Sequence, residues 1–198
     1  MKRIFTLVAC AVFSTAAIFA QVPFKATTIE NGEFAEGTTW YTMGIGEGAK
    51  LIKDNAGADH IALGVSTPKG NDDELWCFVG NETDGYAVYN KQAGATKVLA
   101  SKTTMSPLAG YGGTGGSTHP TMQDAANLPE GYVGRWDFAT SNKIANVNGY
   151  FITLEWTKED FYKKAEDYRA QGDEIYAEKY ELYGDCEGKV FANPDEAK

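Results

Sequence analysis

The stretch Leu75-Trp76-Cys77-Phe78-Val79-Gly80-Asn81-Glu82-Thr83-Asp84-Gly85-Tyr86 decides the fold of this chain. It predicts a short apolar strand, a polar turn that ends at a glycine, and a second strand that begins with an aromatic residue. A similar order returns in Trp136-Asp137-Phe138, which is followed by a turn and by Gly149-Tyr150. The recurrence of a tryptophan-x-phenylalanine strand indicates a repeated β unit.

Short strands and turns are also expected on both sides of this stretch. From about residue 22 to residue 155 the chain is rich in Gly, Thr and aromatic residues in short alternating runs, and it lacks helical periodicity. The expected strands are residues 39–45, 49–53, 60–65, 75–79, 86–90, 97–100, 120–124, 135–140 and 150–154. The fold class is therefore mainly β, built from short antiparallel strands.

An internal repeat organises these strands. A shift of 48 residues places Trp40-Tyr41 over Val88-Tyr89 and Lys50-Leu51 over Val98-Leu99. Two four-stranded units and the start of a third result from this alignment. One such unit cannot bury its own aromatic residues, whereas three units stacked around an axis bury them together.

Residues 38 to 154 resemble a β-trefoil of the ricin-lectin kind, in which each lobe has four strands and a buried tryptophan. Segments 38–43, 73–86 and 88–94 also look like a non-catalytic N-terminal module of secreted glycosidases, sialidases among them, from gut Bacteroidetes. This resemblance implies a lectin-like, glycan-associated accessory domain at the outer surface or in the periplasm. The sequence departs from the pattern after Ile152, where the third lobe should continue.

The C-terminal part of the chain is predicted to be helical. Thr157 and Asp160 have the spacing of a capping box. An aromatic stripe follows at helical spacing, with Gly172 weakening the middle of the helix and Gly184 ending it. The stripe consists of Phe161, Ala165, Tyr168, Ile175, Tyr176, Tyr180 and Tyr183. We expect it to pack on the β body; the alternative is a partner-binding face on residues 157–183.

Three regions follow from these patterns: a signal peptide (1–20), an incomplete or modified β-trefoil (21–155) and a helical C-terminal segment (156–198). The last region either replaces the third lobe or follows it. Residues 191–198 show no clear closing element. An alternative interpretation is therefore that the chain is the front piece of a larger glycosidase.

The N-terminus carries an export signal. Lys2 and Arg3 precede an apolar run, and Ala20 is a small residue at the expected cleavage position. The run is too short to span a bilayer, so no stable membrane span is expected once the signal is removed. Lipidation at Cys10 is an alternative, but the apolar run before it is short. We expect a secreted, periplasmic or cell-surface protein.

Composition limits the possible partners. The chain has 27 acidic and 18 basic residues, a net charge of −9, and two of the basic residues precede the cleavage site. Nucleic acid is not expected as a partner, because phosphate binding needs clustered Lys and Arg. Cys77 and Cys186 remain after cleavage and can either pair in an oxidising compartment or stay free.

No pattern for catalysis, a metal or a cofactor is present. His60 and His119 lack metal-ligand spacing, and the glycine-rich stretch from Tyr111 to His119 lacks the Gly-Lys-Ser/Thr ending of a phosphate loop. Ser117 with His119 lacks a nucleophile elbow. The acidic run 71–74 lacks the ligand alternation of a calcium loop and is expected to be a solvated turn, with sugar hydroxyls as an alternative ligand.

Aromatic residues are the remaining candidates for ligand binding. Sugar sites combine a ring face with a few polar groups. Trp76 and Trp136 match the buried tryptophan of the lobes, so we expect them in the core. Trp40 and Asp137 belong to the wider set of candidates, and the residues chosen as ligand-binding candidates are Tyr41, Tyr86, Tyr89 and Asn90. The sequence thus favours a secreted non-catalytic module that binds carbohydrate, with a structural or protein-interaction domain as the alternative.

Overall fold

The computed structural model describes residues 24–45, 49–53, 61–65, 71–103, 119–138, 143–153 and 156–196. The predicted signal peptide with Cys10, the residue His60, and the glycine-rich stretch as far as Thr118 lie outside these ranges. His119 lies inside them and is buried.

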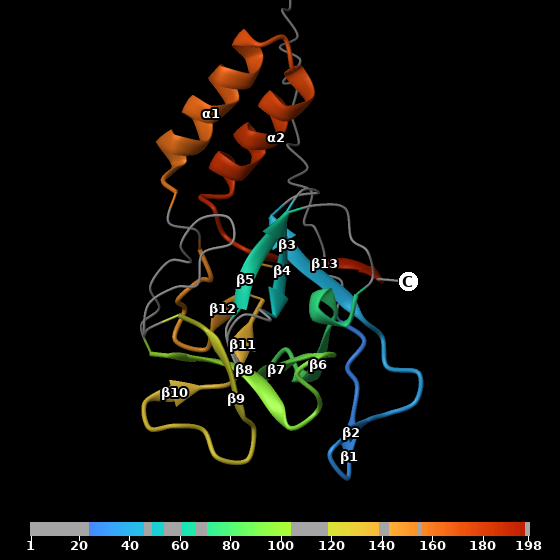
Figure 1. Cartoon of the computed structure of the whole chain (residues 1–198). Coiled ribbons are helices and arrows are strands. Elements are labelled where there is room, and N and C mark those ends of the chain that lie inside the picture. The colour runs from blue at the N-terminus through green and yellow to red at the C-terminus, as the bar shows by residue number, and fades with distance from the viewer. Residues whose placement is uncertain are drawn as a thin grey trace, which may run out of the picture.

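The described chain is mainly β, with short antiparallel strands and two helices near the C-terminus (Figure 1). The strands are β1 (Ile29–Glu30), β2 (Glu33–Phe34), β3 (Tyr41–Ile45), β4 (Ala49–Lys53), β5 (Ile61–Val65), β6 (Trp76–Asn81), β7 (Gly85–Asn90), β8 (Lys97–Lys102), β9 (Thr121–Asp124), β10 (Tyr132–Val133), β11 (Trp136–Asp137), β12 (Ala145–Asn146) and β13 (Phe191–Glu196). The strands expected from β3 to β9 are confirmed within a few residues. The expected strands 135–140 and 150–154 are shorter, the latter consisting of single bridges at Phe151 and Thr153.

Six of these strands form a closed ring. β3 pairs with β6, β6 with β7, β7 with β11, and β11 with β12, all antiparallel. β13 returns to pair with β3, placing Ala192 opposite Met43. Beside β12, the amide of Ile144 donates to the carbonyl oxygen of Val190, just before β13, at 2.9 Å. This contact joins the last strand to the ring and makes it a barrel.

The remaining strands divide the barrel into three lobes. β4 pairs with β5 inside the first lobe, and β8 pairs with β9 inside the second. In the third lobe, Thr153 forms a bridge with Lys189, and the two helices lie between these residues in sequence. The fold is therefore a modified β-trefoil. The helices are an insertion within the third lobe, and the tail that showed no closing element in the sequence is the closing strand β13.

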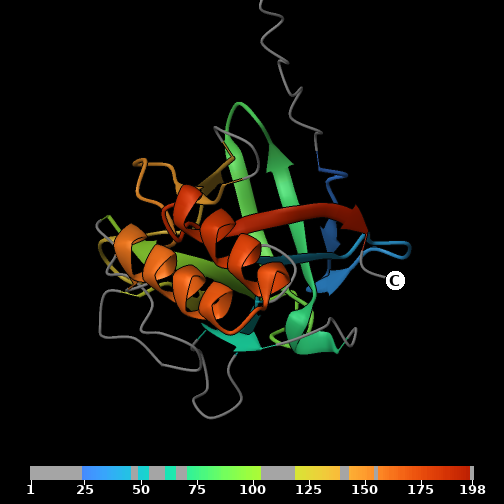
Figure 2. The ribbon, with the colours of Figure 1, turned by 90° about the horizontal axis from the view of Figure 1, so that it is seen from above.

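The C-terminal region contains two helices, α1 (Lys158–Ala170) and α2 (Glu174–Asp185), where the sequence predicted one. Gly172 adopts φ +78° between them, a conformation that glycine reaches without steric cost, so the chain turns back there. The predicted capping box of Thr157 and Asp160 is confirmed. Figures 1 and 2 show the helical pair at one end of the β body.

The pairing register also corrects the internal repeat. Tyr41 lies opposite Trp76, and Tyr86 lies opposite Trp136. Tyr86 is therefore the equivalent of Tyr41 in the second lobe, and the alignment of Tyr41 with Tyr89 is wrong. The error arises because both tyrosines lie on β7, where the sequence alone does not fix which one faces the barrel.

The core is aromatic and includes the first described residue. Trp76 and Trp136 are fully buried, as predicted. Phe24 stacks on Phe78, with ring centroids 4.2 Å apart, and lies 4.6 Å from Phe138. The amide of Thr27 donates to the carbonyl oxygen of Phe78 at 2.8 Å. Phe24 and Thr27, a few residues after the predicted cleavage site, thus attach the start of the described chain to the barrel core.

Candidate functional site

The first two ligand-binding candidates lie in the barrel core. Tyr41 and Tyr86 are 5% and 4% exposed, and both pack edge-on against Phe24. The hydroxyl of Tyr41 accepts a hydrogen bond from the amide of Lys25 at 3.0 Å. Burial, together with nearby Glu82, raises the pKa of Tyr86. The structure brings the two tyrosine rings together, but both pack against Phe24, a side chain of the protein itself.

The other two candidates are neighbours near the end of β7, so their side chains point to opposite faces: Tyr89 lies on the face opposite Tyr86, and Asn90 on the same face as Tyr86. Tyr89 packs with Cys77 in a small second cluster, which the hairpin of β1 and β2 covers, and burial raises the pKa of Tyr89. The side-chain amide of Asn90 donates to the carbonyl oxygens of Asp73 and Leu75 at 2.9 and 3.2 Å. Its oxygen accepts from the amides of the following turn. Its hydrogen bonds are thus made within the protein.

Two of the wider candidates, Trp136 and Asp137, point to opposite faces of their strand. Trp136 is fully buried, and its indole nitrogen donates to the carbonyl oxygen of Leu99 at 2.7 Å. The next residue, Asp137, is exposed. Successive side chains on a strand point to opposite faces, so this pair does not form one site.

Trp40 is the least buried of the aromatic candidates. It is half-buried and packs edge-on with Phe34, at 5.0 Å between centroids. The ammonium of Lys91 lies over the Trp40 ring, 5.6 Å from its centroid. A cation at this distance is attracted by the negative face of the indole.

A carboxylate completes this group. Lys91 Nζ lies 2.7 Å from Asp72 Oδ1, and both side chains are substantially exposed, at 38% and 59%. We call Trp40, Asp72 and Lys91 the Trp40 surface. Its members come from three segments: the loop before β3, the short 3-10 helix Asp72–Glu74, and the turn after β7.

Backbone contacts fix the positions of these segments. The amide of Lys91 donates to the carbonyl oxygen of Leu75 at 2.9 Å. The amide of Gln92 donates to the carbonyl oxygen of Asp72 at 3.1 Å. Asn90 joins the same two segments through its side chain. The acidic run and the turn after β7 are therefore held together before any ligand arrives.

This arrangement brings together an indole ring, a charged donor and a charged acceptor. The ammonium offers hydrogen-bond donors and the carboxylate offers acceptors, both charged and therefore strong. The sequence singled out Trp40 and the acidic run but not Lys91. No sequence signal identifies Lys91, because its role depends on a contact with Asp72 from a distant turn.

The described ranges contain neither a cluster of metal-ligating side chains nor a membrane-spanning helix. No group of three His, Cys, Asp or Glu side chains there is placed to hold a metal ion. None of the helices in that part of the chain is long and apolar enough to cross a membrane. Cys77 and Cys186 are both free thiols. Burial raises the pKa of Cys77 to about 12 and also raises the pKa of Cys186.

Comparison with known proteins gives one match in structure. No family model matches the chain, and no curated protein matches it. A designed 3-fold symmetric protein, ThreeFoil, is 14% identical in sequence and has a TM-score of 0.39. The match covers 58% of this chain and 76% of that one. At this level the similarity carries no information about a ligand.

Proposed function

We propose that this chain is an exported, non-catalytic binding module that recognises carbohydrate at the Trp40 surface. The observation that carries the proposal is the position of Lys91, which lies over the Trp40 ring and 2.7 Å from the Asp72 carboxylate. A sugar that takes the place of the Lys91 ammonium over the ring packs its C–H face there and meets a donor and an acceptor for its hydroxyls. Recognition is shallow, because all three side chains lie at the surface.

The sequence supports both export and a glycan ligand. The N-terminal pattern of Lys2, Arg3, an apolar run and Ala20 supports export, and the resemblance to accessory modules of secreted glycosidases and sialidases supports a glycan ligand. N-terminal sequencing of the protein recovered from outside the cytoplasm tests export. We expect a start near Gln21; an intact Met1 contradicts it.

A glycan array with the mature protein, residues 21–198, tests the proposal. We expect reproducible binding to one glycan class, which Trp40→Ala abolishes and Asp72→Asn and Lys91→Met weaken. Tyr89→Ala is a poor probe because Tyr89 is buried and its loss disturbs packing. Near-ultraviolet circular dichroism and a melting curve confirm that each variant is folded.

Tyr132 provides a matched control. Lys102 lies over its ring at 6.0 Å, so Tyr132→Ala removes a similar cation–aromatic pair elsewhere on the β body. Binding should survive in this variant. Silence of the folded wild-type protein across the array contradicts the proposal. Equal loss of binding in Tyr132→Ala and Trp40→Ala contradicts the assignment of the site.

A further inference from the structure

The aromatic stripe of the helices packs partly on the β body, where Phe161 and Tyr183 join the main core cluster, and partly within the helical pair. Phe161, Ala165, Ala177 and Tyr183 are buried. The rings of Tyr168, Tyr176, Tyr180 and Tyr183 form a continuous row, with neighbouring centroids 5.2–5.3 Å apart. The tyrosines therefore hold α1 and α2 together, and the face open to a partner lies elsewhere.

That open face is on the outside of α2. Ile175 is 80% exposed and Leu182 is 51% exposed. They are seven residues apart, which places them on the same side of the helix, two turns from each other. Half of the exposed large apolar side chains in the described chain belong to α2, the third being Tyr176. We call Ile175, Glu178 and Leu182 the α2 ridge.

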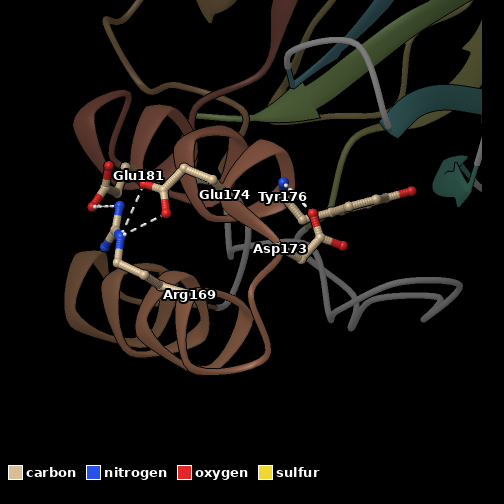
Figure 3. A network of polar contacts seen from close by, with 5 residues as sticks. All are labelled: Arg169, Asp173, Glu174, Tyr176 and Glu181. Carbon is tan, nitrogen blue, oxygen red and sulfur yellow. Dashed lines mark hydrogen bonds and ion pairs between the residues drawn. The ribbon is translucent and has the colours of Figure 1, made fainter.

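The charge around the α2 ridge is negative. Arg169 of α1 hydrogen-bonds to Glu174 and Glu181, at 3.0 Å each, which binds these two carboxylates to the neighbouring helix (Figure 3). Lys179, the one basic residue of α2, lies over the Tyr176 ring. Glu178 lies between Ile175 and Leu182, is exposed, and has no ion pair among the described residues. It is thus available to a cation on a partner.

We propose that the α2 ridge docks into an apolar groove with a basic rim on a partner protein. Two aliphatic anchors at i and i+7 are the spacing with which an amphipathic helix enters a groove. The exposed carboxylate between them selects a positively charged rim. This surface is separate from the Trp40 surface and does not depend on the proposed glycan.

A second copy of the chain is a poor occupant. A two-fold symmetric contact would set the convex ridge against itself and would bring Glu178 toward its own counterpart. The net charge of −9 adds repulsion between copies. The same negative charge attracts a partner that has a basic surface.

The test is affinity capture with the mature chain as bait, using an extract of the cells that produce it. Captured proteins are identified by mass spectrometry, and the candidate partner is purified for affinity measurements at two salt concentrations. The ridge variant is Ile175→Ser with Leu182→Ser. Its matched control is Tyr150→Ser, which removes an apolar side chain of similar exposure, 45%, from the β body.

We expect the wild-type chain and Tyr150→Ser to capture the same basic protein, and the ridge variant to bind it at least about tenfold more weakly. Glu178→Lys should also weaken binding and reduce its salt dependence. Equal binding by wild type and ridge variant overturns the proposal, as does the absence of any protein captured by wild type alone. Sedimentation that shows a wild-type dimer lost in the ridge variant also overturns it, in favour of a second copy.

Discussion

Two buried asparagines show at the scale of single residues why the ligand candidates differ from the observed site. Asn90 and Asn146 each end a strand, donate from the side-chain amide to a neighbouring segment, and accept from amides of the following turn. An asparagine after a tyrosine has the same local sequence whether its amide faces a sugar or a turn. The partners that decide this lie 15 or more residues away, so the role of Asn90 was not predictable locally.

The first prediction concerns Asn90. We expect Asn90→Ala to lower the free energy of unfolding by about 2 kcal/mol or more, because buried backbone groups lose their partners. Urea unfolding followed by circular dichroism measures the change. Asn148 is exposed, so Asn148→Ala is a control that should change stability by less than about 0.5 kcal/mol. Equal stability of wild type and Asn90→Ala contradicts the role of Asn90 as a clamp.

At the scale of elements, the sequence was informative wherever the determinants were local. Alternation located the strands from β3 to β9, and the Thr157–Asp160 spacing located the start of α1. Gly172 is recognisable in the sequence as a weak point of the helix. Whether the chain turns back there depends on the packing of α2 onto α1, which involves tyrosines in both helices. The Trp40 surface shows the same limit, because the partnership of Lys91 and Asp72 is a tertiary contact.

The capping box predicts an acid sensitivity of α1. Hydrogen bonds from the backbone and side chain of Thr157 lower the pKa of Asp160. The contribution of a carboxylate with a lowered pKa is fully present above its unfolded value of about 3.9, and it is lost as pH falls through the lowered value. We therefore expect wild type to be more stable than Asp160→Asn at pH 7, and this difference to be smaller at pH 3, below the unfolded value of about 3.9.

Urea unfolding of both proteins at the two pH values measures this difference. The matched control is Asp137→Asn, which alters an exposed carboxylate outside the helices. A gap between wild type and Asp160→Asn that stays the same at both pH values would refute the linkage.

At the scale of the whole molecule, closure of the barrel was the least predictable feature. It depends on β13 returning to β3 after the helical insertion, and on the contact between Ile144 and Val190. The short C-terminal segment gives no local sign of this pairing. The sequence pattern also gives no sign of the role of Phe24, although its ring contacts Tyr41, Phe78, Tyr86 and Phe138 from two lobes.

The central position of Phe24 predicts that the N-terminal segment is needed for stability. We expect Phe24→Ala to destabilise the fold by about 3–5 kcal/mol, the usual cost of removing a buried phenylalanine ring. Lys25→Ala keeps the backbone contact with Tyr41 and removes only an exposed side chain, so it should be nearly neutral. Thermal unfolding compares the two variants. Similar melting temperatures for Phe24→Ala and wild type would show that the ring is dispensable.

The most direct test of the glycan-binding proposal is a calorimetric titration of wild type and Trp40→Ala with the glycan that binds best on the array. The proposal predicts saturable binding by wild type and an affinity at least about tenfold lower for Trp40→Ala, with both proteins folded. Equal affinities for the two proteins would contradict it and would place any glycan contact away from Trp40, Asp72 and Lys91.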